Sequence, residues 1–226
     1  MIKIALDGPS GAGKSTVAKA VAKRLGIVYV DTGALYRSIG LFIQRLGIDK
    51  RDSEKIIPQL DNIDLALVFE NGAQKVILNG EDVSGLIRTG EIAMYASAVS
   101  AIPEVRAFLL ETQRKIAREH SVIMDGRDIG TVILPDAEVK IFMVASPEAR
   151  ARRRYLELIE KGEICTYDSV LADIVKRDKD DSTRAVAPAI PAEDAIFLDN
   201  SDLTIEGTVD RALEIIFSKV DKGAVL

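Results

Sequence analysis

Residues 8–15 carry the chemistry that is easiest to recognise in this chain, because they read Gly-Pro-Ser-Gly-Ala-Gly-Lys-Ser and fit the pattern G-x-x-x-x-G-K-[ST]. Backbone N–H groups surround a polyphosphate only where the chain wraps tightly, which glycine permits. In this P-loop motif Lys14 reaches the β- and γ-phosphates and the Ser15 hydroxyl binds Mg²⁺. The predicted triphosphate-binding residues are Gly8, Pro9, Ser10, Gly11, Ala12, Gly13, Lys14, Ser15 and Thr16.

The flanking sequence supports the motif. Residues 2–6 are a short apolar run ending at Asp7, and apolar residues four apart follow the loop as far as Gly26. A strand, a glycine-rich loop and a helix place phosphates at a helix N-terminus, where free N–H groups and the helix dipole favour anions. The competing dinucleotide-binding pattern fails, because Thr16 stands where its third glycine belongs.

Composition limits the remaining function classes. The 226 residues are 47% hydrophobic, which predicts one domain with a substantial core, or one domain with an insert. The net charge of −5 argues against nucleic acid as a partner, whereas a small anionic substrate needs only local positive charge. No apolar run reaches membrane length and the N-terminus reads as a core strand, so we expect no membrane contact and a cytoplasmic location.

The rare residues exclude several mechanisms. The single cysteine, Cys165, cannot form an intrachain disulfide, which is typical of a reducing compartment. The single histidine, His120, is expected at the surface where a helix gives way to a strand. Together they exclude most zinc sites and the common nucleophilic triads.

Five short apolar segments alternate with helical ones and predict an α/β fold, a parallel five-stranded sheet with helices on both faces. The expected strands are 2–6, 27–30, 122–124, 139–144 and 195–198, and the helices that follow the central part of the chain are 147–161, 168–179 and 205–219. Ligands bind at the carboxyl ends of such strands. Asp7, Asp31, Asp125 and Ser146 fall at these ends.

Residues 62–87 interrupt the alternation. Two apolar runs and the turn sequences Asn71-Gly72 and Asn79-Gly80 predict an antiparallel hairpin with a second turn, hence an inserted lobe. A short helix is expected before it, at 53–60, and two helices after it, at 89–100 and 104–119. The tail after Lys219 is expected to fray.

Arginines follow the strand ends. Arg37 and Arg127 come shortly after two of the strand ends. The helix after the strand at 139–144 carries Arg150, Arg153 and Arg154 on one face. An expected loop at 178–183 is bracketed by Arg177 and Arg184. Surface charge paired with nearby acids is the alternative, and we favour it for Arg152. Guanidinium groups bind phosphate bidentately. A phosphate acceptor is largely a dianion at neutral pH and needs no general base.

Taken together, these segments resemble bacterial cytidylate kinases over almost the whole chain. The motifs that carry the resemblance are Gly8–Ser15, Asp31–Arg37, Asp82–Gly85 with Ile87–Thr89, Asp125–Thr131 and Arg184–Pro188. The inserted hairpin is similar to that of the long bacterial form, where it extends the monophosphate-binding region. The resemblance implies a core of residues 1–32, 119–147 and 192–220, a monophosphate-binding region at 33–118, and a lid at about 150–185.

The resemblance also implies a reaction, in which ATP with Mg²⁺ phosphorylates CMP or dCMP. Arg37, Arg127 and Arg184 would hold the CMP phosphate, and Thr32 would also bind CMP. Ser97, Arg106 and Asp128 would recognise cytosine, and Asp128 would repel the carbonyl at position 4 of uracil. Arg177 and Asp181 would contact ribose and phosphates, and Arg153 and Arg154 would belong to the lid. The proposed catalytic residues are Lys14, Arg127, Arg153, Arg154 and Arg184, and the family implies a monomer.

Alternatives stay open at this point. Ser97 could simply pack inside a helix and Arg106 could be solvated. A small-metabolite kinase would use a hydroxyl acceptor and a carboxylate base such as Asp31 or Asp125. A pure nucleotide-binding module is disfavoured because both halves of a two-substrate site are expected. A regulatory GTPase is disfavoured because the chain lacks an Asn-Lys-x-Asp or Thr-Lys-x-Asp sequence.

Overall fold

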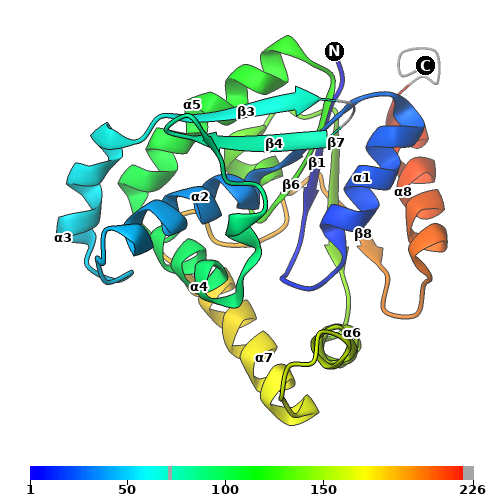
Figure 1. Ribbon diagram of the computed structural model, residues 1–226. Coiled ribbons are helices and arrows are strands. Elements are labelled where there is room, and N and C mark those ends of the chain that lie inside the picture. The colour runs from blue at the N-terminus through cyan, green and yellow to red at the C-terminus, as the bar shows by residue number, and fades with distance from the viewer. Residues whose placement is uncertain (71–72, 221–226) are drawn as a thin grey trace. The chain divides into compact units, whose positions relative to one another are not determined.

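The computed structural model describes residues 1–70 and 73–220, and the chain divides into two compact units (Figure 1). Unit 1 comprises residues 1–27 and 122–220, and unit 2 comprises the described residues of 28–121. The turn expected at Asn71-Gly72 and the tail from residue 221 lie outside the described residues.

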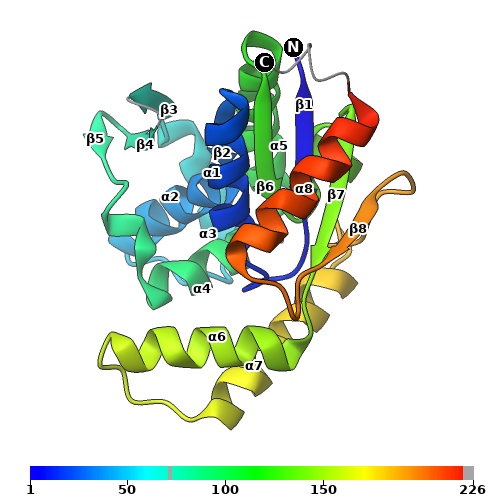
Figure 2. The ribbon, with the colours of Figure 1, turned by 90° about the vertical axis from the view of Figure 1, so that its right-hand side faces the viewer.

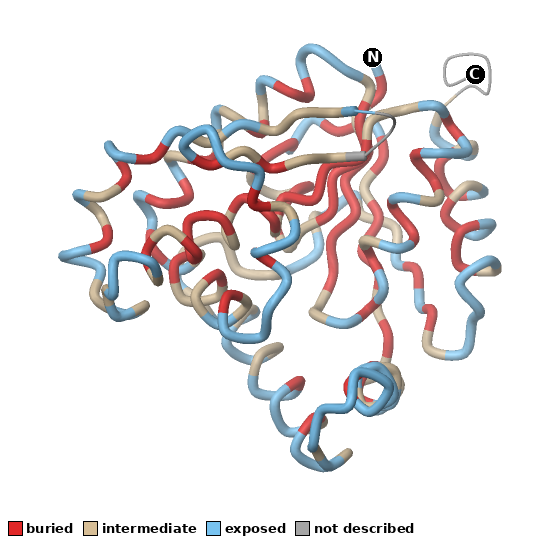
Figure 3. Tube along the Cα trace, in the orientation of Figure 1, coloured by how far each residue is buried: buried red, intermediate tan, exposed pale blue. Residues whose placement is uncertain are grey.

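Unit 1 alternates strands and helices. Its elements are β1 (Lys3–Asp7), α1 (Lys14–Leu25), β6 (Val122–Gly126), the π-helical turn η3 (Ile129–Ile133), β7 (Val139–Val144), α6 (Pro147–Glu160), α7 (Tyr167–Thr183), β8 (Ile196–Asp199) and α8 (Ile205–Lys219). Strands β1, β6 and β7 are short runs that are buried in the middle of the sheet, as the tube coloured by burial shows, whereas β8 is largely exposed (Figure 3). Burial on both faces explains why these runs are apolar without alternation.

The parallel sheet has the strand order β2-β6-β1-β7-β8, with β2 (Val28–Asp31) at one edge, which confirms the predicted fold class. In its centre Ile4 of β1 pairs with Ile123 of β6 and with Val139 of β7. Within unit 1, α1 and α8 pack against each other, and α6 packs against α7 (Figure 2). The sheet thereby brings the carboxyl ends of β1 and β6 side by side.

Unit 2 holds the inserted lobe. Besides β2, its elements are α2 (Thr32–Arg45), α3 (Ser53–Ile56), the 3-10 helices η1 (Ile57–Asn62) and η2 (Leu86–Arg88), β3 (Leu65–Glu70), β4 (Ala73–Leu78), β5 (Glu81–Asp82), α4 (Gly90–Val99) and α5 (Pro103–Glu119). Strands β3, β4 and β5 form a separate antiparallel sheet, which confirms the predicted hairpin and second turn. Asn79 and Gly80 both have positive φ, as a type I′ turn requires.

The helix ends follow local signals. Asp31, Ser146 and Thr89 cap α2, α6 and α4 through their side chains, and Pro103 opens α5. His120 follows α5 at an exposed position, as expected.

One expectation about unit 1 was wrong, and one element was not anticipated. Residues 178–183 are not a loop, because α7 continues to Thr183. The hydroxyls of Ser182 and Thr183 donate to the carbonyl of Lys179, so polar side chains that favour loops stabilise the last helical turn instead. The π-helical turn η3 had no counterpart in the predicted elements.

Within residues 1–70 and 73–220, no helix on its own has the length and apolar character needed to cross a membrane. The pair α4 and α5, bent by 99°, passes that test only when both are counted together.

Candidate functional site

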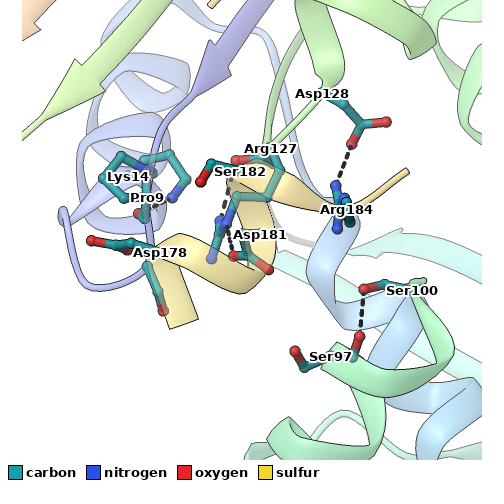
Figure 4. Close-up of polar contacts among 12 residues, drawn as sticks. Pro9, Lys14, Ser97, Ser100, Arg127, Asp128, Asp178, Asp181, Ser182 and Arg184 are labelled. Carbon is teal, nitrogen blue, oxygen red and sulfur yellow. Dashed lines mark hydrogen bonds and ion pairs between the residues drawn. The ribbon is translucent and has the colours of Figure 1, made fainter. Parts of the chain in front are cut away.

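The P-loop connects β1 to α1 and folds around a buried lysine. Lys14 begins α1 and donates its ammonium group to the carbonyl of Pro9 at 2.7 Å (Figure 4). Burial lowers the pKa of Lys14 well below its usual value, and the nearby Arg127 guanidinium lowers it further. The carboxylates of Asp125, Asp7 and Asp181 act in the opposite direction without cancelling this effect, so an added anion would stabilise the charged lysine.

Gly8 is fixed by packing against the neighbouring strand. Its φ is +147°, and a Cβ built on it would lie 2.0 Å from the carbonyl oxygen of Met143 in β7. No side chain fits there, so glycine is required before any ligand is considered.

The hydroxyl of Ser15 donates to Oδ2 of Asp125 at 2.7 Å. Asp125 is the second-last residue of β6 and is buried. A hydroxyl and a carboxylate are hard oxygen donors, the kind that Mg²⁺ prefers. Among the described residues, no group of three or more His, Cys, Asp or Glu side chains could hold a metal ion alone. The donor set suits Mg²⁺ that arrives with phosphate ligands of its own.

Asp7 links the P-loop strand to the segment after β6. Its carboxylate accepts hydrogen bonds from the backbone N–H groups of Ile129 at 2.8 Å and Gly130 at 2.7 Å. Burial raises the pKa of Asp7 to about 6, although these two hydrogen bonds lower it. Asp7 thereby anchors the backbone directly after Asp128. The sequence placed Asp7 at a strand end but did not reveal this anchoring contact.

The structure brings several predicted residues of unit 1 together. Arg127 donates Nε to Oδ2 of Asp181 at 3.0 Å (Figure 4). Asp181 and Arg127 are both among the charges that act on Lys14. Arg184, the residue after α7, lies with Nη2 3.9 Å from Oδ1 of Asp128, and both side chains are largely buried. Two motifs some fifty-six residues apart in the sequence thus meet beside the P-loop lysine.

The arginines of α6 do not act alike. Arg150 is buried and forms two hydrogen bonds with the carboxylate of Asp178 in α7, at 2.9 and 2.5 Å. Arg153 donates to the backbone carbonyls of Asn200 at 2.6 Å and Ser201 at 3.3 Å. Arg154 pairs with Glu157 on its own helix. Three arginines on one helix face therefore have three different sets of partners.

Arg177 lies on α7 at a half-buried position. Arg152 is exposed, in keeping with the surface interpretation. Cys165 packs beside the small core of α6 and α7, where nothing in its surroundings indicates a nucleophile.

In unit 2, Asp31 organises the start of α2, which carries Thr32 and Arg37. Oδ1 of Asp31 caps the helix by accepting from the N–H of Ala34. Oδ2 lies 2.8 Å from Nη2 of Arg88 and 3.7 Å from Nη1 of Arg37. Sequence reasoning had quoted Arg88 only as part of a motif, and its partner is fifty-seven residues away.

The backbone of Asp31 is held by a side chain of the inserted sheet. Gln74 in β4 accepts from the N–H of Asp31 at 2.8 Å and donates to its carbonyl at 3.3 Å. The lobe is thereby fixed to the end of β2.

Arg106 is 8% exposed, so the interpretation of a solvated helix position was wrong. It donates to the carbonyl of Ser100 at 3.0 Å, and its guanidinium lies 5.4 Å from the ring centroid of Tyr36, a cation–π contact. Ser100 in turn donates to the carbonyl of Ser97 (Figure 4). Ser97 and Arg106 are thus joined through Ser100, and the side chain of Ser97 is half-buried.

A parallel sheet whose first strand runs into a P-loop, with Arg127 close to the P-loop lysine, defines a P-loop protein with a site for phosphoryl chemistry. The sequence profile described as cytidylate kinase matches residues 4–218. The chain belongs to the cytidylate kinase family, a family of kinases.

Individual relatives agree with this. The chain is 50% identical to the cytidylate kinase of Caldicellulosiruptor saccharolyticus over 219 residues, which cover 97% of both chains. It is 51% identical to the cytidylate kinase of Caldanaerobacter subterraneus over 224 residues, 99% of this chain and 98% of the relative. Among solved structures, an uncharacterized protein from Eubacterium ventriosum aligns with a TM-score of 0.51 over 96% of this chain and 98% of its own. At 15% identity that likeness concerns the fold alone.

Proposed function

We propose that this protein transfers the γ-phosphate of ATP to CMP or dCMP, giving ADP and CDP or dCDP. The observation that carries the proposal is the closeness of Arg127 to the P-loop lysine, at the strand end that also presents Asp128. A P-loop alone would support any nucleotide hydrolase. The half-buried guanidinium of Arg127 beside Lys14 supports an acceptor that is itself a phosphate.

Phosphoryl transfer spreads negative charge over the equatorial oxygens, so positioning and electrostatic stabilisation supply most of the catalysis. Lys14 would exchange the carbonyl of Pro9 for the β- and γ-phosphates. Arg37, Arg127 and Arg184 would bind the acceptor phosphate, which is largely a dianion at neutral pH and attacks without a general base. Arg127 and Arg184 are each held by a carboxylate in the structure, and we expect the acceptor phosphate to compete for them.

Cytosine recognition would fall to Ser97, Arg106 and Asp128. A carboxylate accepts from the exocyclic amino group of cytosine and repels the carbonyl that uracil carries at that position. The buried Asp128 is suited to this role, because a poorly solvated carboxylate discriminates strongly between a donor and an acceptor. Thr32, Arg177 and Asp181 would contact the ribose and the phosphates.

Mg²⁺ would be held by the Ser15 hydroxyl, with the carboxylate of Asp125 behind it. When bound, the ion neutralises charge on the β- and γ-phosphates. ATP is the co-substrate rather than a resident cofactor.

Residues at about 150–185 would act as a lid that closes over ATP and excludes water. Arg153 and Arg154 would then release their present partners and turn toward phosphate. Crystal structures with and without both nucleotides test this step, and an unchanged position of α6 and α7 would count against it. We further propose that the protein works as a cytoplasmic monomer on small nucleotides, with neither nucleic acid nor membrane as a partner.

The test of the function is ADP formation from ATP and Mg²⁺ with CMP, dCMP, UMP, AMP, GMP, shikimate or gluconate as acceptor, beside a control without acceptor. We expect strong turnover with CMP and dCMP and little with UMP. Turnover only with shikimate or gluconate, or equally without any acceptor, would overturn the assigned acceptor while leaving the P-loop interpretation intact.

Asp128→Asn sharpens the test. The amide keeps the size of the side chain but offers uracil a donor, so the ratio of kcat/KM for CMP to that for UMP should fall by about tenfold or more. The same substitution at Asp199, an exposed carboxylate that ends β8, serves as the control and should leave the ratio unchanged. An unchanged ratio in Asp128→Asn would remove Asp128 from the cytosine site.

A further inference from the structure

Two side chains from outside the P-loop hold its backbone carbonyls. Nη1 of Arg150, on α6, donates to the carbonyl of Ser10 at 2.9 Å. Nδ2 of Asn200, the residue after β8, donates to the carbonyl of Ala12 at 2.9 Å. Both Arg150 and Asn200 are buried, at 2% and 4% exposed.

These contacts fix the direction of the peptide groups that follow. No peptide bond in the described chain is cis, and in a trans peptide the C=O and the next N–H point in opposite directions. A carbonyl of Ser10 held toward Arg150 turns the N–H of Gly11 the other way. A carbonyl of Ala12 held toward Asn200 does the same for the N–H of Gly13.

Burial along the loop fits this alternation. Ala12 is buried, whereas Gly11 and Gly13 on either side of it are exposed. The N–H groups of exposed glycines are available to an anion, while the carbonyls between them are satisfied from behind. Phosphate oxygens would otherwise face a mixture of donors and repelling carbonyl oxygens.

Arg150 and Asn200 are themselves held in place by further hydrogen bonds. Arg150 also donates to the carbonyl of Ala145 and makes its paired hydrogen bonds with Asp178. The backbone N–H of Asn200 donates to the carbonyl of Val144 at 2.9 Å, and its own carbonyl accepts from Arg153. The side chain of Arg150 therefore cannot turn away without breaking several hydrogen bonds. The backbone of Asn200 is fixed on both sides, and its side-chain Oδ1 also accepts from Nη1 of Arg153 at 3.4 Å.

We propose that Arg150 and Asn200 are positioning residues of the phosphate cradle, which aim the N–H groups of Gly11 and Gly13 at the phosphates of ATP. The proposal rests on the proposed function, because it assumes that the P-loop binds ATP. It assigns Arg150 to the loop itself rather than to the lid arginines with which it shares a helix face.

The test relates each of these two residues to one backbone amide, Arg150 to that of Gly11 and Asn200 to that of Gly13. Asn200→Leu keeps the branched shape without a donor or a charge, and Arg150→Lys keeps the charge but cannot reach both Ser10 and Asp178. In ¹H–¹⁵N spectra, ATP should shift the amide of Gly13 in the wild-type protein and much less in Asn200→Leu. The amide of Gly11 should lose its shift in Arg150→Lys instead.

Affinity gives the second readout. The Kd for ATP, measured calorimetrically without acceptor, should rise about tenfold to a hundredfold in both variants. The affinity for inorganic tripolyphosphate, measured by displacement of ATP, should fall by a similar factor. The KM for CMP should stay within about twofold of the wild-type value. Asp199→Asn and Arg152→Met, neighbours exposed to solvent, serve as controls with wild-type affinity.

The outcomes separate the two claims. If folded Asn200→Leu and Arg150→Lys bind ATP as the wild type does, the positioning role is wrong. If an amide shift is lost at both glycines in either variant, the one-to-one assignment is wrong. If the wild type binds ATP but does not phosphorylate CMP, only the proposed acceptor fails. If Arg150→Lys does not fold, the chemical shift of the Gly13 amide in Asn200→Leu alone tests the positioning role.

Discussion

The ammonium group of Lys14 lies 2.7 Å from the carbonyl oxygen of Pro9, five residues earlier in the same loop. This contact spans the loop and gives the lysine an uncharged hydrogen-bond partner. Because burial and Arg127 lower the pKa of Lys14, the charged form is disfavoured until an anion binds.

Lys14→Ala should therefore abolish phosphoryl transfer without unfolding the protein, since removing a poorly solvated cation costs little stability. Turnover and thermal unfolding check the two parts. Retained turnover would contradict the assigned role.

ATP should also raise the pKa of Lys14, so that the wild-type protein takes up protons on binding ATP at alkaline pH. Calorimetry in buffers of different ionisation enthalpy measures this uptake, which should vanish in Lys14→Ala. Equal proton uptake by both proteins would place the titrating group elsewhere.

Asp7 should make stability depend on pH with a sign opposite to that of most carboxylates. Its pKa is about 6 in the folded protein and 3.8 in the unfolded chain, so the folded state holds the extra proton between these values. The contribution to the free energy of unfolding is then present at low pH and is lost as the pH rises toward 6, by up to about 3 kcal/mol.

Asp7→Asn should remove this dependence. Urea unfolding of both proteins across this pH range measures it, and curves that run parallel would show that Asp7 does not titrate as stated. Asp199→Asn is a suitable comparison, because the pKa of Asp199 is lowered by hydrogen bonds from Ser201 and its contribution has the opposite sign.

Gly8→Ala should destabilise the protein by about 3 kcal/mol or more, because the new Cβ would collide with the backbone of Met143. The expected signature is a lower midpoint of urea unfolding, observed without any nucleotide. Gly85→Ala adds the same methyl group where no atom lies within 4 Å and φ is negative, and should be nearly neutral. If Gly8→Ala and Gly85→Ala were equally stable, the backbone of β7 would have to move to make room for the new Cβ.

Arg88→Met should weaken the binding of CMP, because it changes the ion pairing of Arg37. Without Arg88, the carboxylate of Asp31 is left to Arg37 alone and competes with the acceptor phosphate. We expect KM for CMP to rise about tenfold with kcat little changed. Arg45→Met removes another ion pair of the same unit, with Glu81 at 2.6 Å, and should leave KM unchanged. A fall in kcat with constant KM would contradict this account.

The sequence was most informative where the signal is local. The P-loop, the strand ends marked by Asp31 and Ser146, and the buried strands can each be recognised from a few neighbouring residues. Arg127 and Asp128 could be chosen because a strand end precedes them. The end of α7 was misjudged because Ser182 and Thr183 favour loops as readily as they bond back to a helical carbonyl.

The residues that sequence reasoning missed act over long separations. Asn200 meets Ala12 across 188 positions, and no periodicity or spacing encodes such a contact. Its place at the end of a predicted strand was the one available signal. Arg150 was grouped with Arg153 and Arg154 by helical spacing, which gives a shared face but not the partner that each side chain finds.

Gln74 completes the end of β2 in the way that a neighbouring strand would. Strand β2 stands at the edge of the parallel sheet, and the side-chain amide of Gln74 occupies both the N–H and the C=O of Asp31. An exposed edge invites strands of other molecules to add to it. Here the inserted lobe closes the edge at its last residue, so no additional strand can pair with the backbone of Asp31 while Gln74 stays in place.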